Sequence, residues 1–186
     1  MQKFIPIILM FLLISCSSSP SGPELQRKEQ VLIEEGFEGL KWYEVPKGWR
    51  KWESNGKVKI FKEGTDAYAH LSAWGTSIYE TGNASLTSPV LEGIKHYEDE
   101  VRIDFEYRLH KNIWNGYNPM GTASVGLLWK KGEELDTSGS WKKYSVTQKV
   151  DFEPELYPRA DFDLDCETGE LTFDIDDVII TRIYYE

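Results

Sequence analysis

Two aromatic residues, Trp114 and Tyr117, lie in the turn-rich stretch 112–118, which also contains three asparagines. A planar ring can stack on the apolar C–H face of a sugar, while neighbouring amide groups bind the sugar hydroxyls. The residue types in this stretch therefore predict contact with a carbohydrate. The alternative is that both rings cap the hydrophobic core from a loop, as large aromatic side chains often do.

Three more aromatic residues are candidates for the same ligand. Tyr68 and Trp74 alternate with small apolar residues in the segment 67–74, which places both on the polar side of the expected strand. Tyr79 follows just beyond it. The other tryptophans are expected to pack in the core or at a sheet edge: Trp42, Trp49, Trp52, Trp129 and Trp141.

Two carboxylates have a spacing that hydrolysis of a glycosidic bond could use. Alternation places Asp104 and Glu106 on one face of a strand, and a retaining glycosidase needs two carboxyl groups about 5–5.5 Å apart. Arg102 and Arg108 flank them on the same face, so a solvated ladder of opposite charges explains all four residues. We therefore expect no catalysis, and an atypical glycoside hydrolase or lyase is an alternative.

Other catalytic patterns are missing from the sequence. The three histidines, His70, His96 and His110, have no metal-binding spacing. There is no G-x-S-x-G motif and no glycine-rich phosphate loop before a helix. The net charge of −10 and the lack of a Lys/Arg stripe argue against nucleic-acid binding.

The elements that must carry these residues are β-strands. Apolar and polar residues alternate most clearly over 101–109. The same period of two recurs in other segments: 57–61, 67–74, 84–87, 123–129, 144–150, 160–166 and 171–176. Turn signals such as Asn115-Gly116 and Thr168-Gly169 separate the strands, and no segment keeps a helical period over the length of an ordinary helix. The pattern predicts an all-β fold, an antiparallel β-sandwich.

The first residues look like the export signal of a lipoprotein. Lys3 precedes the apolar run 4–14, which is shorter than the roughly 20 residues of a membrane span. The run ends in Leu13-Ile14-Ser15-Cys16, which resembles the bacterial lipobox. The resemblance implies that residues 1–15 are removed and that acylated Cys16 anchors the chain to a membrane.

The segment 16–31 is then interpreted as the lipidated cysteine and a flexible tether, and the domain as residues 32–186. Ser17, rather than an aspartate, follows Cys16, which resembles the sorting pattern of outer-membrane lipoproteins. With Cys16 acylated, Cys166 has no partner for an intramolecular disulfide and is expected to be a small buried residue.

A series of short landmarks follows the order found in the jelly-roll modules of carbohydrate-binding proteins. They are Glu35-Gly36-Phe37-Glu38, Pro46–Trp49, Ala69–Trp74, Leu86–Leu91, Trp141–Tyr144 and Leu171–Val178. Their order is also similar to the choice-of-anchor and cleaved-adhesin domains of bacterial surface proteins. The resemblance spans roughly residues 33–186 and implies a jelly roll of the galactose-binding or concanavalin type.

The resemblance also implies a structural calcium ion. In related modules a Glu and an Asp hold Ca²⁺ at places that match Glu38 and either Asp176 or Asp177, and Glu63 and Asp66 could add oxygens from a nearby turn. Calcium takes six to eight oxygen ligands. Strict alternation predicts that Asp176 points outward and Asp177 inward. The alternative is a strand-end bulge with Asp177 hydrogen-bonded to a turn.

Together these features predict a lipid-anchored carbohydrate-binding module of the bacterial cell envelope, without catalysis. Its expected partners are a polysaccharide or glycan and the outer membrane, with the domain facing the periplasm or the cell surface. The main alternative is an adhesin-like or assembly module that binds envelope proteins and exposes a flat apolar patch.

Overall fold

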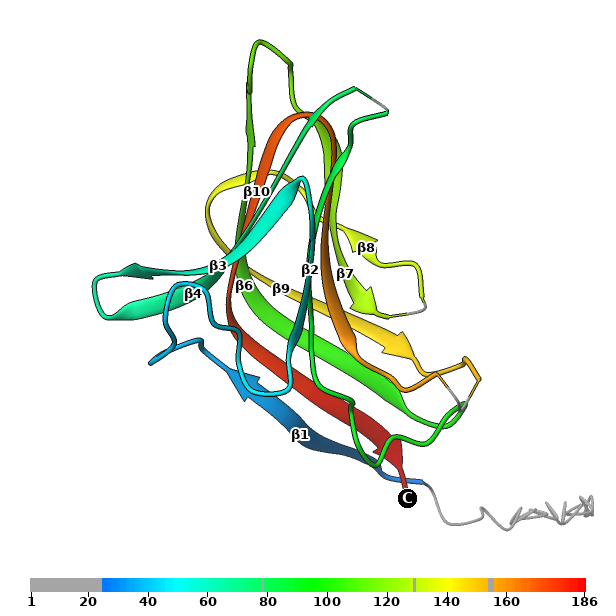
Figure 1. Ribbon diagram of the computed structural model, residues 1–186. Coiled ribbons are helices and arrows are strands. Elements are labelled where there is room, and N and C mark those ends of the chain that lie inside the picture. Colours follow the sequence, from blue (N-terminus) through cyan, green and yellow to red (C-terminus); the bar gives the residue numbers. More distant parts are fainter. Residues whose placement is uncertain (1–24, 78, 129, 154–155) are drawn as a thin grey trace, which may run out of the picture.

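The computed structural model describes residues 25–186 except 78, 129 and 154–155, and these described residues form strands and no helix. In chain order the strands are β1 (Arg27–Glu35), β2 (Arg50–Ser54), β3 (Gly56–Glu63), β4 (Asp66–Thr76), β5 (Gly82–Thr87), β6 (Glu100–Asn112), β7 (Met120–Leu127), β8 (Glu133–Glu134), β9 (Ser138–Lys149) and β10 (Ala160–Tyr185). Every strand pair is antiparallel. The predicted all-β, antiparallel fold is therefore confirmed (Figure 1).

The last strand, β10, takes part in two layers because it bends sharply near Gly169 (Figure 1). Before the bend it pairs with β5 and β7, and after the bend it pairs with β4 and β6. Gly169 has a φ of 74°, and a Cβ added there would lie 2.6 Å from the Cα of Pro119, so the bend requires glycine. The sequence predicted two separate strands, 160–166 and 171–176, where the structure has one bent strand.

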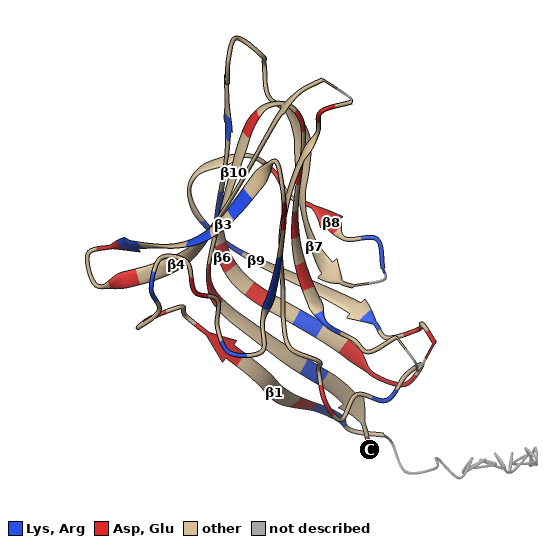
Figure 2. Ribbon diagram, viewed as in Figure 1, with Lys and Arg blue, Asp and Glu red and all other residues tan. Residues whose placement is uncertain are grey.

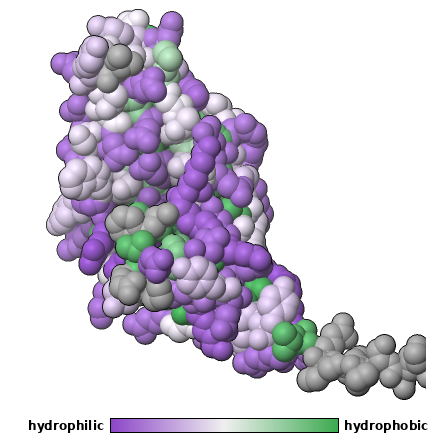
Figure 3. Space-filling view, turned by 90° about the vertical axis from the view of Figure 1, so that its right-hand side faces the viewer, coloured by the Kyte–Doolittle hydropathy of each residue, from purple (hydrophilic) through white to green (hydrophobic). Residues whose placement is uncertain are grey.

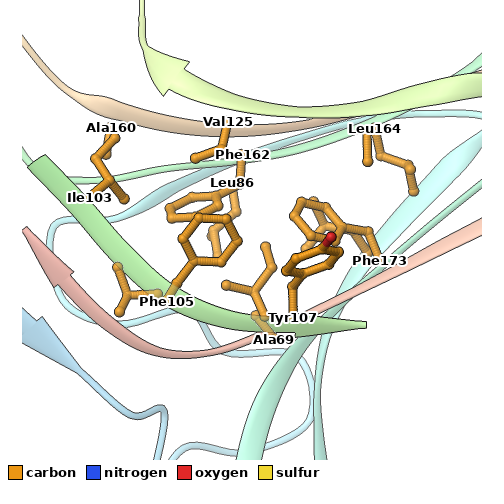
Figure 4. Close-up of a cluster of buried hydrophobic side chains, with 14 of the residues drawn as sticks. Ala69, Leu86, Ile103, Phe105, Tyr107, Val125, Ala160, Phe162, Leu164 and Phe173 are labelled. Atoms are coloured by element: carbon orange, nitrogen blue, oxygen red, sulfur yellow. The ribbon is translucent and has the colours of Figure 1, made fainter. Parts of the chain in front are cut away.

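The two layers pack face to face as a β-sandwich. The first layer has the order β2-β5-β10-β7-β8, and the second layer has the order β3-β4-β10-β6-β9. Phe162 of the first layer meets Phe105 of the second, with ring centroids 5.2 Å apart. Figure 4 shows these rings pointing toward one another between the ribbons. The hydrophobic core therefore lies between the two layers.

Strand β6 shows how alternation divides the second layer into two faces. Its core-facing residues are those expected from the sequence: Val101, Ile103, Phe105, Tyr107 and Leu109. From Glu100 to His110, the residues between them are half-buried on the opposite side, which we call the outer face. Cys166 is buried in the core, as predicted. The outer face of the second layer carries the candidate site.

Strand β1 continues the second layer beyond the end of β4. Along one edge of β10, β4 pairs up to Ile175 and β1 pairs from Val178 onward. The tether predicted over 16–31 is therefore corrected, because Arg27–Val31 already pair with β10. Their side chains are exposed, so no hydrophobic pattern marks them as a strand.

The signal segment 1–15 and Cys16 lie outside the described residues. Among the residues that are described, none forms a helix long and apolar enough to cross a membrane.

Candidate functional site

The outer face of the second layer carries several of the aromatic residues predicted to bind a ligand. On β4, Tyr68, His70, Ser72 and Trp74 lie on this face, while the residues between them enter the core. Alternation thus placed Tyr68 and Trp74 on the correct side of the strand. Tyr68 is nevertheless only 8% exposed, because neighbouring side chains of the outer face cover it.

A buried carboxylate, Asp174, forms the centre of the outer face. It lies opposite His70 of β4 and Arg108 of β6 in the strand register, so the three side chains form one row across the sheet. Asp174 Oδ1 lies 2.5 Å from His70 Nδ1, and Asp174 Oδ2 accepts a hydrogen bond from Arg108 Nε at 2.5 Å. Asp174 is only 4% exposed, and these two partners offset the cost of burying its charge.

Arg108 extends this row to a pair of aromatic rings. Its guanidinium lies 4.9 Å from the ring centre of Tyr68 and 4.7 Å from that of Trp141, within the range of cation–π attraction. Arg108 Nη1 also donates a hydrogen bond to Glu63 at 3.2 Å. Burial opposes the charged form of Arg108, but the hydrogen-bonded ion pair with Asp174 outweighs it and raises the pKa of the guanidinium.

Trp141 was expected to pack in the core or at a sheet edge. It lies on β9, the edge strand of the second layer, and is half-buried on the outer face. Its ring meets that of Tyr68 edge to face, with centroids 5.4 Å apart. Tyr68 and Trp141 form what we call the aromatic wall. Its members come from β4 and β9, and only the folded sheet brings them together.

An acidic pocket borders the aromatic wall where β4 and β1 leave a gap along β10. The cavity measures about 520 Å³ and is also lined by Glu106 of β6. It brings together every residue predicted from the sequence as a calcium ligand: Glu38, Glu63, Asp66, Asp176 and Asp177. The gap between the two strands therefore gathers carboxylates from several distant segments.

A β-bulge in β10 determines how these carboxylates point. The register with β6 shifts between Asp176 and Ile179, and Asp177 has a φ of 49°. Asp177 is exposed, and its backbone N–H donates a hydrogen bond to Asp176 Oδ1 at 2.8 Å. The prediction that Asp177 points inward is wrong, because the bulge interrupts the alternation on which it relied.

The charged form of Asp176 is disfavoured by burial and by the neighbouring carboxylates. Burial raises the pKa of its carboxyl to about 6, and repulsion from Asp177, Glu38 and Asp66 adds to the rise. The hydrogen bond from the Asp177 N–H acts in the opposite direction without cancelling it. At neutral pH the acidic pocket therefore holds negative charge that a bound cation would stabilise.

The oxygen-rich lining of the acidic pocket is the donor chemistry that calcium prefers. Within residues 25–186, apart from the positions not described, no three acidic, histidine or cysteine side chains converge as a metal-ligand group. The carboxylates line one cavity without meeting at one point. Calcium binding at this pocket therefore stays a prediction.

A second cleft of about 690 Å³ adjoins the acidic pocket and shares three of its acidic residues. Acidic positions follow one another along β6 and at the end of β1 (Figure 2). The two carboxylates considered for hydrolysis line this cleft, but both are paired. Asp104 accepts a hydrogen bond from Arg102 Nε at 2.8 Å, and Glu106 lies 3.1 Å from Lys143 Nζ. These contacts are those of a charge ladder.

Trp74 and Trp114 meet further along the outer face. Their ring centroids are 6.3 Å apart and their planes are tilted by 42°. Together with Asn55, Thr76 and Glu80 they line a cleft of about 270 Å³, which we call the tryptophan cleft. Neither tryptophan belongs to the core cluster, so Trp114 does not cap the core. The cleft offers two aromatic surfaces and polar groups beside them.

The other two predicted aromatic residues do not line the tryptophan cleft. Tyr117 pairs with Trp114 through two backbone hydrogen bonds, and the residue is 44% exposed. Tyr79 is 90% exposed in the turn after β4. Tyr117 thus fixes the turn that holds Trp114, while Tyr79 lies free at the surface of the described chain.

No protein-family model matches the sequence, and no curated protein sequence matches it. Several solved structures are similar. The CBM22-1 xylan-binding domain from Paenibacillus barcinonensis Xyn10C has a TM-score of 0.51 at 15% identity, over 83% of this chain and 95% of that chain. A cyclase from Fischerella sp. TAU has a TM-score of 0.58 at 15% identity, over 83% and 98% of the two chains.

An arabinose-bound MgGH51 α-L-arabinofuranosidase is similar over 83% of this chain but only 27% of its own, with a TM-score of 0.54 at 12% identity. A binding module, a cyclase and part of a glycosidase thus share one architecture, and a common fold at this identity does not imply a common function. The comparisons establish that this chain has the jelly-roll sandwich fold found in carbohydrate-binding modules.

Proposed function

We propose that the protein is a non-catalytic, lipid-anchored carbohydrate-binding module of the bacterial cell envelope. The observation that carries this proposal is the tryptophan cleft, where the rings of Trp74 and Trp114 lie 6.3 Å apart beside polar groups. Rings in this position can stack on the C–H faces of a sugar. The side chains of Asn55, Thr76 and Glu80 are then placed to bind its hydroxyls.

The length of the outer face suits a polymer rather than a single sugar. Tyr68 and Trp74 lie on the same side of β4 and six residues apart, which corresponds to roughly 20 Å along a strand. The aromatic wall and the tryptophan cleft are therefore separated by the length of several sugar units. The xylan-binding neighbour, which shares the fold, makes a polysaccharide the first class of ligand to test.

The arrangement of the chain ends is consistent with an anchor at Cys16. The backbones of Gln26 and Glu186 hydrogen-bond to each other in both directions, so the described N-terminal end lies beside the C-terminus. The turn that carries Trp114 lies at the opposite end of the molecule (Figure 1). A domain tethered through its N-terminal segment would thus present the tryptophan cleft away from the membrane.

The adhesin-like and assembly alternatives call for a flat apolar patch. The side of the molecule seen in Figure 3 is mostly hydrophilic, with apolar residues in small separate areas. The pairing of Asp104 with Arg102 and of Glu106 with Lys143 likewise argues against the hydrolase alternative. The side seen in Figure 3 thus carries no flat apolar patch, and the paired carboxylates favour a ligand that is bound and not cleaved.

The proposal is tested with the mature chain carrying Cys16→Ser, so that it is soluble, against a panel of insoluble and soluble polysaccharides. We expect retention by at least one polysaccharide, loss of retention in Trp114→Ala, and no release of reducing sugar. Trp52→Ala is the matched control, because Trp52 is 65% exposed on β2 in the other layer. If no polysaccharide is retained, the protein-interaction alternative replaces this proposal.

A further inference from the structure

We propose that the tryptophan cleft selects neutral sugar units and rejects uronic acids, and that Glu80 is the side chain that makes this distinction. The inference rests on the proposed function and names the class of polysaccharide that the same cleft takes. Two features of the cleft support it: the hydrogen-bonding groups beside the two rings and the charges around them.

The two rings of the cleft are free to receive a ligand. Trp74 and Trp114 are both half-buried, and both line the cavity. Among the described residues, the basic side chains that lie over aromatic rings contact other rings of the molecule. The faces of these two tryptophans are therefore not occupied by a cation of the described chain, and a sugar can stack on them.

A short turn after β4 holds Glu80 in the lining of the cleft. The Glu80 N–H donates to the Ser77 carbonyl oxygen at 3.0 Å, and the Thr76 N–H donates to the Glu80 carbonyl oxygen at 3.2 Å. The Thr76 hydroxyl donates a hydrogen bond to Glu80 Oε2. The other oxygen of the carboxylate, Oε1, has no hydrogen-bond partner among the described residues. Glu80 is thus fixed in place with one acceptor left for a ligand.

The polar side chains beside the rings suit a ligand that donates hydrogen bonds. The Thr76 hydroxyl has already committed its hydrogen to Glu80, and Asn55 Nδ2 donates to the Thr81 carbonyl oxygen at 3.2 Å. The acceptors that remain are Glu80 Oε1 and Asn55 Oδ1. A sugar hydroxyl can donate to these oxygens, whereas the ionised carboxylate of a uronic acid only accepts.

The charges around the rings act in the same direction. The lining of the cleft includes Glu80 and no basic residue. Glu170 lies opposite Trp74 in the strand register and on the same face, so a second carboxylate borders the rings. Lys57 is one row further along this face, and its amine lies 3.9 Å from Glu53. A negatively charged sugar would therefore be repelled at the cleft.

The net charge of −10 also disfavours polyanions, so the local effect of Glu80 needs a control of equal charge. Glu98 provides it, because its side chain is 70% exposed and it precedes β6, whereas Trp114 follows β6. Glu98→Gln and Glu80→Gln remove the same charge at opposite ends of that strand. Glutamine keeps an acceptor oxygen, so Glu80→Gln should still bind a neutral ligand.

The experiment compares β-1,4-linked hexamers that share a backbone and differ in charge: glucose and xylose against glucuronic acid, and mannose against mannuronic acid. Binding to the mature Cys16→Ser chain is measured by calorimetry at pH 7.5 with EDTA, at low and at physiological salt. We expect a neutral hexamer to bind at least about tenfold more tightly than its uronic counterpart, and the ratio to shrink as salt rises. Glu80→Gln should reduce the ratio at least about threefold, and Glu98→Gln should leave it unchanged.

The outcomes separate this inference from the proposed function. Equal affinity for a neutral hexamer and its uronic counterpart, or tighter binding of the uronic one, overturns the inference and leaves carbohydrate binding supported. A ratio that changes equally in Glu80→Gln and Glu98→Gln, or in neither, also overturns it, provided that both variants keep the native melting temperature. Absence of binding to every neutral hexamer overturns it too, and the polysaccharide panel then decides the proposed function by itself.

Discussion

Asp174 and Arg108 form a partly buried ion pair that joins β10 to β6, with Arg108 Nε donating a hydrogen bond to Asp174 Oδ2 at 2.5 Å. The pair also sets the geometry of the outer face, because the guanidinium that it holds lies against Tyr68 and Trp141. His70 contacts the other oxygen of the same carboxylate. One buried charge thus organises three strands of the second layer.

Removing this charge should destabilise the domain. Asp174→Asn leaves Arg108 without its main counter-ion in a partly buried position, so we expect the free energy of unfolding to fall by about 2–3 kcal/mol. Urea denaturation at pH 7.5 measures it. Glu98→Gln is the control, since the Glu98 side chain is 70% exposed. A loss no larger than that of the control would show that the pair does not stabilise the fold.

Acidification should remove the free-energy cost of keeping the Asp176 carboxylate charged in the folded protein. Its pKa in the folded protein is about 6, above the ordinary value of 3.8, so the folded state binds the proton more tightly than the unfolded state. The carboxyl therefore destabilises the fold at neutral pH, and the lost stability returns as the pH falls from about 7 toward 4. Partial exposure reduces the effect to about 1 kcal/mol.

The matched comparison is wild type against Asp176→Asn. The variant should be more stable by about 1 kcal/mol at pH 7.5, and the two proteins should converge near pH 4. Denaturation curves at several pH values measure the free energy of unfolding of both proteins. Subtracting one from the other cancels the contribution of every other titrating group. A difference that stays constant with pH, or that grows on acidification, would refute this account of Asp176.

Calcium is the cation that the resemblance to carbohydrate-binding modules implies for the acidic pocket. If the carboxylates of Glu38, Asp66 and Asp176 bind it, added calcium should raise the melting temperature by several degrees and EDTA should reverse the rise. Asp176→Asn should weaken this response. An identical melting temperature in calcium and in EDTA would rule out the structural calcium ion.

The predicted membrane attachment depends on acylation of one atom, the sulfur of Cys16. In cells, the wild-type chain should fractionate with the outer membrane and incorporate labelled fatty acid. Cys16→Ser should appear in the soluble fraction and remain unlabelled, because a serine hydroxyl does not replace the thiol in this modification. Membrane association of Cys16→Ser would contradict the anchor.

Alternation predicted the strands whose two faces differ most. In β6 and β4 one face is buried and the other half-exposed, so the period of two was visible and the positions of Tyr68 and Trp74 followed from it. The grouping of Glu38 with Asp176 came from the resemblance to known modules, and the acidic pocket does contain both.

What the sequence could not reveal depends on contacts between distant segments. Arg27–Val31 pair at a sheet edge with exposed side chains, so no hydrophobic pattern marked them as a strand. Alternation gave no sign of the role of Asp174, because its partners are on other strands. Strict alternation does not encode the bulge at Asp177, which the sequence analysis gave as the alternative to an inward-pointing side chain and which the structure contains.

The most direct test of carbohydrate binding is the affinity of the tryptophan-cleft variants for the polysaccharide that the panel identifies. Calorimetry on Trp74→Ala and Trp114→Ala should show at least a tenfold loss of affinity, about 1.4 kcal/mol, with melting temperatures close to that of the wild type. Trp52→Ala, on the other layer, should bind as the wild type does. Unchanged affinity in both cleft variants would contradict the central claim that this outer face is the carbohydrate-binding surface.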